Sequence, residues 1–400
     1  MHQSDNATYL RPASTAKVEY DQKSPDDGRR DGLHVGMVGT YPPTECGIAT
    51  FSANVREALM GARPGWRVSV VSVVDEVPEQ PAPEATYWAR SQTNSLQASI
   101  EMLNNCDTVI IQHEFGIFPG RDGESVLDLV DSLRVPLVVS LHTVLTSPSP
   151  HQHVIVQRLI DAADVVVVPS ASALERLRST HATRDVTVVP HGASANFTDE
   201  RHLASAPTIL TWGLLGPGKG LEQGIEAVSL LGDLEPAARY VLSGRTHPNL
   251  RRAGEDPYRR SLEKMVSFHG VNDVVHFDDR YQGWGTLRAM IRRASVVLLP
   301  YQSRDQISSG VLVEALASGK PIVATPFPHA IEMLSSGAGL LVDFDDVEAM
   351  AGALRKILVR PELAQFMSEQ ARSVGHTLLW PQIGRRLGAV VEELTERVAR

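Results

Sequence analysis

Residues 303–331 read SRDQISSGVLVEALASGKPIVATPFPHAI, and this stretch gives the clearest indication of the fold class. Small residues at 308–310 run into an apolar helical pattern that carries one carboxylate, Glu314, and stops at 318–319. A β-rich run, PIVAT at 321–325, follows at once and ends in a proline-rich loop. A helix feeding directly into a buried Val/Ile strand is typical of a parallel α/β sheet.

The start of this helix predicts a site for an anion and a sugar. Ser308, Ser309 and Gly310 are small, so a diphosphate can approach the amide N–H groups that a helix start leaves without intrahelical partners. Glu314 lies one turn further in, where its carboxylate can accept two hydrogen bonds from the vicinal diol of a ribose. Without such partners a glutamate among apolar neighbours would be poorly solvated.

Outward from this stretch, β-rich runs alternate with helical patterns along the chain, which predicts two doubly wound α/β domains. Ligands bind such sheets at the carboxyl ends of their strands, and the cleft between the domains is the expected site. The first series of β-runs comprises residues 33–41, 67–74, 107–114, 136–142, 164–170 and 186–193, and the second comprises 208–216, 238–244, 274–279, 295–301, 321–325 and 339–344.

The domain boundaries follow from changes in composition. Residues 1–31 are polar and are expected to form a disordered tail. The N-terminal domain is expected over 32–196 and the C-terminal domain over 207–378, joined by a polar linker. A last helix over 379–400 begins beside Trp380–Pro381.

Composition excludes some classes of protein. The net charge of −9 argues against a nucleic-acid binder held by phosphate contacts. Two distant cysteines and the absence of a disulfide pattern favour a reducing compartment. Neither a signal peptide nor an apolar run of the ~18 residues that a membrane span needs is present. We therefore expect a cytoplasmic protein, for which weak peripheral membrane contact stays open.

Two motifs of the first series are candidate site elements. Gly47, in GTYPPTECGIATF (39–51), opens a helix after a strand and would let an anion approach the helix start, although a tight βα turn explains it equally well. His113, in IIQHEFGIFPG (110–120), follows a buried strand and could orient a hydroxyl or take a proton. The alternative is a histidine satisfied by backbone groups.

Two cations of the second series are candidate phosphate ligands. Lys219 lies in the glycine-rich turn WGLLGPGKG (212–220), where Gly218 frees the backbone. Gly220 follows the lysine, so this is not a P-loop, and a solvated lysine is the alternative. Arg245, in LSGRTHPN (242–249), could pair with phosphate oxygens.

Metal binding is not expected. The acidic run DFDD (343–346) precedes a helical pattern and is better explained as a helix N-cap. His151 and His153 have the spacing of a ligand pair, but no third ligand is near them in sequence.

The order of these motifs resembles the retaining glycosyltransferases of the GT-B fold, family 4. The resemblance covers about residues 33–400, and its most specific piece is SSGVLVEALASGKPIVAT. It implies two Rossmann-like domains facing a cleft, an N-terminal acceptor domain, a C-terminal nucleotide-sugar donor domain, and a final helix that crosses back to the first domain. It implies transfer of a hexose from a nucleotide-diphosphate sugar to a hydroxyl of a saccharide, lipid-linked or small-molecule acceptor, without a metal or other cofactor.

The resemblance also assigns roles to residues. Glu314 matches the ribose ligand, which is the second glutamate of the family's E-x7-E motif, His113 matches the active-site histidine, and Lys219 matches the phosphate-binding lysine. The first glutamate of that motif falls on Gln306, which can still form hydrogen bonds to the transferred sugar but supplies no charge. An arginine usual after the strand-end glycine falls on Leu214, and Arg245 is the suggested substitute.

Three functions remain open at this point. A transferase leads, with Lys219, Arg245 and the helix tip at 308–310 stabilising the departing diphosphate. A sugar phosphorylase or a nucleotide-sugar epimerase would keep the fold and change the reaction. A non-catalytic binding protein would explain Gln306 and Leu214. Donors of the GDP-mannose and UDP-glucose types are both compatible with the sequence.

Overall fold

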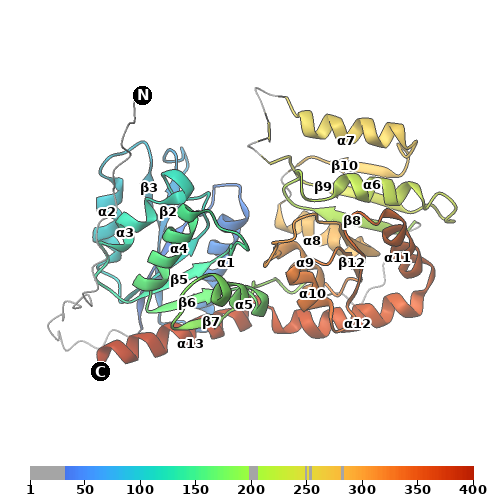
Figure 1. The fold of residues 1–400 in the computed structure, drawn as a ribbon. Helices are drawn as coiled ribbons and strands as arrows, with labels where there is room; N and C mark the ends of the chain where they lie inside the picture. The colour runs from blue at the N-terminus through green and yellow to red at the C-terminus, as the bar shows by residue number, and fades with distance from the viewer. Residues whose placement is uncertain (1–31, 198–205, 248–249, 252–254, 281–282) are drawn as a thin grey trace, which may run out of the picture.

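A computed structural model of the chain describes residues 32–197, 206–247, 250–251, 255–280 and 283–400. The tail predicted over 1–31 and the middle of the predicted linker lie outside the described residues. The structure has two halves side by side, each built on a parallel sheet (Figure 1).

The first half contains a sheet with the strand order β3-β2-β1-β4-β5-β6-β7. Its strands are β1 (His34–Gly39), β2 (Arg67–Val74), β3 (Ala85–Ala89), β4 (Thr108–His113), β5 (Leu137–Leu141), β6 (Val165–Val168) and β7 (Val186–Val188). Its helices are α1 (Gly47–Ala62), α2 (Ser95–Leu103), α3 (Val126–Val130), α4 (Pro150–Ala162) and α5 (Ala171–Thr180).

The second half contains a sheet with the order β10-β9-β8-β11-β12-β13. Its strands are β8 (Thr208–Trp212), β9 (Arg239–Ser243), β10 (Val275–Asp278), β11 (Val296–Leu299), β12 (Ile322–Ala324) and β13 (Gly339–Leu341). Its helices are α6 (Leu221–Ser229), α7 (Pro257–Phe268), α8 (Trp284–Arg293), α9 (Gly310–Ala317), α10 (Pro328–Leu334), α11 (Val347–Val359) and α12 (Pro361–Thr377), and α13 (Trp380–Ala399) follows.

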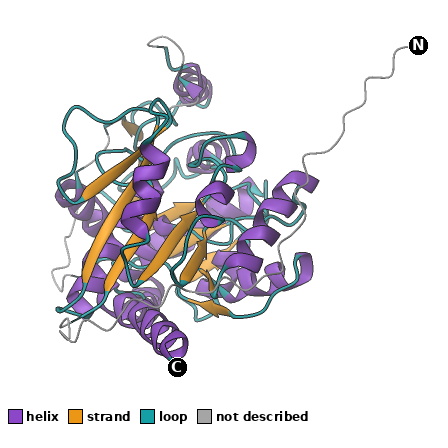
Figure 2. Ribbon diagram, turned by 90° about the vertical axis from the view of Figure 1, so that its left-hand side faces the viewer, coloured by secondary structure: helices purple, strands orange, loops and turns teal. Residues whose placement is uncertain are grey.

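Helices cover both faces of each sheet, which is why the strands read as unbroken apolar runs. In the first half, α1 and α13 cover one face and α2 to α5 the other, and Figure 2 shows these strands between helices. In the second half, α6, α7 and α11 cover one face, and α8, α9, α10 and part of α12 cover the other. Among the described helices, none is long and apolar enough to cross a membrane.

The last helix returns to the first half. Helix α12 ends under the second sheet, and α13 then packs along α1 of the first half (Figure 1). A short parallel bridge between Ala193 and Leu379 brings the connection between the halves beside the start of α13. The return of the chain that the sequence resemblance implied is therefore present.

The sequence prediction missed some elements and misjudged others. Strand β3 and helix α12 were not predicted. Helix α3 covers only the middle of the sequence GESVLDLVDSL (123–133), which has a helical pattern throughout. The prediction that DFDD caps a helix is confirmed, because the Asp346 carboxylate accepts the amide hydrogen of Ala349 at 2.8 Å, at the start of α11.

Candidate functional site

The order of strands places the candidate residues of the second half at one edge of its sheet. Strand β8 lies between β9 and β11, so the loops that leave the carboxyl ends of β8 and β11 run in opposite directions. The β8 loop holds Lys219, whose Nζ lies 4.1 Å from the ring centroid of Tyr301, just beyond β11. This contact holds the ammonium group at the edge where ligands of such sheets bind.

Glycine is required in the lysine turn. Gly220 has φ 64°, and a Cβ there would lie 1.7 Å from the carbonyl oxygen of Pro300. Gly218 has φ 84°. On the other side of the turn, a Cβ on Gly213 would lie 3.6 Å from Cγ2 of Val311, in the first turn of α9. The lysine turn and the start of α9 are therefore neighbours, as a site for a nucleotide diphosphate requires.

The start of α9 differs in part from the prediction. Ser309 caps the helix by accepting the amide hydrogen of Leu312 at 3.3 Å. Its own N–H was expected to be available to an anion, but it donates to Nδ1 of His329 at 3.0 Å. Gly310 leaves no side chain at the first helical position, and the ring of His191 lies 3.1 Å from where a Cβ would stand.

One carboxylate oxygen of Glu314 accepts a hydrogen bond, and the other has no partner among the described residues. Its Oε1 accepts the amide hydrogen of Ser194 at 3.3 Å, from the connection between the two halves. Its Oε2 is buried and has no hydrogen-bond partner within the described part of the chain. Burial raises the pKa of Glu314 to about 8, against smaller lowering effects of the Ser194 hydrogen bond and of Arg288. A donor such as a ribose hydroxyl would satisfy the second oxygen.

Gln306 does not present its amide to α9. Its side-chain Nε2 donates to the backbone carbonyl of Ser308, and its backbone carbonyl accepts the amide hydrogen of His329 at 3.2 Å. The adjacent Asp305 is turned to the first half, where it pairs with Arg176 at 3.4 Å. Gln306, which aligns with the first glutamate of the E-x7-E motif, therefore uses its side-chain amide in a hydrogen bond to a residue two positions away.

A pair of opposite charges joins the two halves near Gly47. Gly47 is the first residue of α1, and open space surrounds the position of its missing Cβ. Just before it, Oε2 of Glu45 lies 2.8 Å from Nη1 of Arg245, which follows β9. Both side chains are about half exposed. Arg245 therefore lies at the expected place but is paired with a carboxylate, which an anionic ligand would have to displace.

His113 is the last residue of β4 and is fully buried. Neither ring nitrogen has a partner among the residues that the structure describes, which contradicts the alternative of a histidine satisfied by backbone groups. Burial lowers the pKa of His113 to about 4, which keeps the ring neutral at pH 7. Its ring stacks on Phe118 with centroids 6.1 Å apart. A neutral ring can orient a hydroxyl but is a weak base.

Two residues of this region were not predicted as site residues. His191 follows β7 and falls in the predicted β-run 186–193, so its strand-end position was the available signal. His329 is in the proline-rich loop and helix start after β12, and no pattern marked it. Both contact the first residues of α9.

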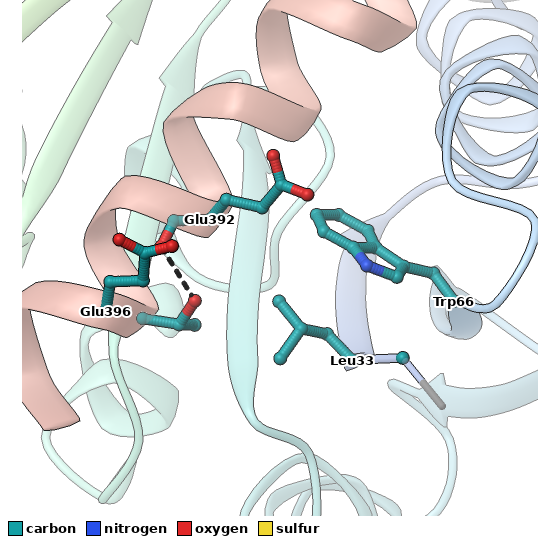
Figure 3. A pocket seen from close by; sticks show the side chains of 6 residues that line it. Leu33, Trp66, Glu392 and Glu396 are labelled. Carbon is teal, nitrogen blue, oxygen red and sulfur yellow. Dashed lines mark hydrogen bonds between the residues drawn. The ribbon is translucent and has the colours of Figure 1, made fainter. Parts of the chain in front are cut away.

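A cavity of about 320 Å³ lies elsewhere, between α13 and the start of β1 (Figure 3). Its lining includes Leu33, Trp66, Glu392 and Glu396, and none of the predicted site residues. Glu392 is already bound by Arg63, with two contacts of 2.6 Å. The cavity is therefore separate from the candidate site.

Comparison with known proteins places these features in a family. Residues 195–374 match the family model described as glycosyl transferases group 1. The D-inositol 3-phosphate glycosyltransferase of Corynebacterium glutamicum is 28% identical over 66% of this chain and 68% of its own length. The α-D-kanosaminyltransferase of Streptomyces kanamyceticus is 26% identical over 60% of this chain and 65% of its own length.

Solved structures share the fold. Sucrose-phosphate synthase from Thermosynechococcus elongatus superposes with a TM-score of 0.74 at 19% identity, covering 91% of this chain and all of that one. HepE of Anabaena, solved in complex with UDP, gives a TM-score of 0.72 at 14% identity, covering 90% of this chain and all of that one. Residues 195–374 therefore form a domain that matches the group 1 glycosyltransferases, and the chain is a glycosyltransferase with the GT-B fold.

Proposed function

We propose that this enzyme is a retaining hexosyltransferase that moves a mannose- or glucose-type sugar from a nucleotide-diphosphate donor to an acceptor hydroxyl. The observation that carries the proposal is the unsatisfied, buried Oε2 of Glu314 beside a glycine-rich turn that holds Lys219. The carboxylate suits a ribose diol, and the ammonium group suits a diphosphate.

The departing diphosphate would be stabilised by protein groups rather than by a metal. Lys219 supplies one positive charge, and Gly310 opens the start of α9 to phosphate oxygens. Arg245 would add a second charge after release from Glu45. Gly218 lets the turn backbone approach the donor.

The first half would bind the acceptor. His113 is neutral and buried at the end of β4, so it suits orientation of a hydroxyl better than removal of a proton. Gly47, at the open start of α1, would contact an anionic part of either substrate.

The names of the similar proteins suggest, by analogy, which donor and acceptor substrates to test. Several are named as D-inositol 3-phosphate glycosyltransferases, and one as a phosphatidyl-myo-inositol mannosyltransferase. Structural neighbours were solved with UDP or UDP-glucose. A polyol or saccharide acceptor fits these names, a lipid-linked one would involve peripheral membrane contact, and the base of the donor is open.

A panel of ligands tests the proposal. UDP, GDP, UDP-glucose and GDP-mannose would be added separately while thermal unfolding is followed. A ligand present at ~100 times its dissociation constant stabilises the folded protein by ~2.7 kcal/mol, enough to identify the base. Unchanged unfolding with all four would contradict the proposal.

Turnover separates a transferase from the alternatives. With the donor identified, nucleotide diphosphate should be released in the presence of inositol or saccharide acceptors, with ~10²-fold or greater loss in Lys219→Ala. Lys264→Ala, which removes an exposed lysine of α7, is the matched control. Binding without turnover of any donor would favour a non-catalytic protein, and donor-independent phosphorolysis would favour a phosphorylase.

A further inference from the structure

Two histidines from different halves meet at the start of α9. His329, on α10, is fully buried and accepts the amide hydrogen of Ser309 with its Nδ1 at 3.0 Å. His191, from the connection after β7, lies with its Cε1 and Nε2 atoms each 3.1 Å from where a Cβ of Gly310 would stand. The two rings therefore lie at consecutive residues of the helix start, Ser309 and Gly310.

The hydrogen bonds fix the tautomers of both rings. Because Nδ1 of His329 is an acceptor, a neutral ring carries its proton on Nε2, which is buried and has no partner in the described ranges. Nδ1 of His191 lies 2.7 Å from the carbonyl oxygen of Gly192 and must donate to it, which leaves Nε2 as an acceptor.

Both rings are neutral at pH 7. Burial, together with a smaller effect of His191, lowers the pKa of His329 to about 3. Burial also lowers the pKa of His191 to about 4, against a smaller raising effect of its bond to Gly192. Neutral rings add no charge for a diphosphate, so this pair suits an uncharged polar group.

A hydroxyl group matches the pair, because it accepts one hydrogen bond and donates another. The side chain otherwise expected to contact the transferred sugar, Gln306, donates instead to the carbonyl of Ser308. The same segment is held by the backbone of His329, whose N–H donates to the carbonyl of Gln306 at 3.2 Å. The histidine pair thus lies beside the segment that carries Gln306, whose own side chain is engaged with Ser308.

We propose that His329 and His191 bind one hydroxyl of the transferred sugar, His329 donating from Nε2 and His191 accepting at Nε2. The pair is a specificity determinant that distinguishes a nucleotide sugar from the bare nucleotide diphosphate. This inference rests on the proposed function, since it requires a sugar nucleotide at the start of α9.

Asparagine variants separate this role from a structural one. In His329→Asn, the side-chain oxygen stands near the former Nδ1 and can still accept from Ser309, whereas the Nε2 donor is lost. In His191→Asn, an amide hydrogen can still reach the carbonyl of Gly192, whereas the Nε2 acceptor is lost. The matched control is His153→Asn, which changes a half-buried histidine on α4 that stacks on His181, away from α9.

Calorimetry would measure the dissociation constants of UDP and UDP-glucose, and of GDP and GDP-mannose, for each protein. The informative quantity is the ratio of the constants for sugar nucleotide and diphosphate, because a fraction of unfolded variant affects both alike. We expect each site variant to raise this ratio about tenfold, which corresponds to the loss of one hydrogen bond. The double variant should raise it by less than the product of the two single changes, because the residues share one hydroxyl.

The outcomes separate the two proposals. If wild-type protein binds none of the four ligands, the proposed function falls and this inference falls with it. A second outcome is that the wild-type protein binds one diphosphate and its sugar nucleotide while both site variants keep the wild-type ratio of the two dissociation constants, as the control His153→Asn should. The two rings would then bind only water or backbone groups, and this inference alone would be overturned. An equal loss of affinity for diphosphate and sugar nucleotide would also overturn it, because the pair would then act on the nucleotide.

Discussion

At the scale of single residues, the two carboxylate oxygens of Glu314 have different environments. One oxygen holds the connection between the halves through Ser194, and the other is buried without a partner in the described part of the chain. Such an arrangement destabilises the charged form of the free protein, because an ionised carboxylate out of water needs hydrogen bonds on both oxygens. The free energy of unfolding of the free protein is therefore lower when Glu314 is ionised, and a ligand that donates a hydrogen bond to Oε2 would recover part of this loss.

This leads to a prediction about pH. The folded-state pKa of Glu314, about 8, lies above its ordinary value of 4.5, so the folded protein binds more protons than the unfolded chain between these values. The stability from this group is complete below pH 4.5 and is lost as pH rises through 8. Glu314→Gln, which cannot ionise, should therefore gain progressively on wild type between pH 4.5 and pH 8, so that its advantage in free energy of unfolding is larger at pH 9 than at pH 6 by about 1–3 kcal/mol.

Urea unfolding at pH 6, 7.5 and 9 measures this difference. Glu393→Gln, an exposed glutamate of α13, serves as the control and should follow wild type at every pH. Parallel curves for wild type and Glu314→Gln would show that the carboxyl group is ionised in the free protein.

The sequence predicted where a residue lies when its position depends on one helix or turn. It did not predict contacts that form only when two elements pack together. Lys219 and Glu314 lie on a predicted turn and a predicted helix, and both are at the carboxyl edge of the second sheet. His329 acquires its partner only because α10 packs beside the start of α9. The pairing of Arg245 with Glu45 joins residues 200 positions apart, which no local pattern reveals.

At the scale of elements, helix α5 is held by a residue of the other half. The Glu332 carboxylate accepts the amide hydrogens of Ala171 and Ser172 at 3.1 and 3.2 Å. Ser170 caps the same helix and donates its hydroxyl hydrogen to the carbonyl of Ile307 at 2.9 Å. The loop that leads into α9 is thereby fastened to the first half at the start of α5.

Removing this carboxylate should weaken the helix and the contact between the halves together. We expect Glu332→Ala to lower the free energy of unfolding by about 1 kcal/mol, since it removes an acceptor and a negative charge from a helix N-terminus. The urea midpoint measures this loss, and Glu369→Ala on the exposed face of α12 is the control. Equal midpoints for the two variants would mean that water replaces the carboxylate without loss.

The elements themselves were largely predictable from the sequence, because buried parallel strands leave continuous Val and Ile runs. Strand β3 escaped because its sequence, ATYWA, is short and has no such run. Helix α12 lies directly after α11, so two helices follow each other where the alternating pattern predicts a strand. The pairing order of the strands was not predicted, because no residue pattern in the sequence indicates it.

At the scale of the whole molecule, α13 links the candidate site to the first half. It begins at Trp380, whose ring lies 5.8 Å from the ring of His191 and 5.5 Å from that of Phe51 on α1. Further along, Arg63 and Glu392 join α1 to α13 through a two-point ion pair. A change in the packing of α13 is therefore expected to reach the start of α9 through His191.

Gly384 gives the most direct test of this packing. A Cβ at this position would lie 2.2 Å from the carbonyl oxygen of Ala58, a backbone atom of α1 that cannot rotate away. Alanine normally stabilises a helix interior by ~1 kcal/mol over glycine. Here we expect Gly384→Ala to destabilise the protein by about 1–3 kcal/mol, because α1 and α13 must separate.

Gly352→Ala, in α11, is the matched control, because no atom outside the helix lies within 4 Å of the added Cβ and no packing has to change. It should raise the free energy of unfolding by about 0.5–1 kcal/mol through helix propensity alone. Both variants make the same chemical change in a helix, so the difference in sign between their unfolding midpoints isolates the contact with α1. Stabilisation by both would mean that α13 lies farther from α1 than the structure has it, and that the returning helix is not what positions Trp380 and His191.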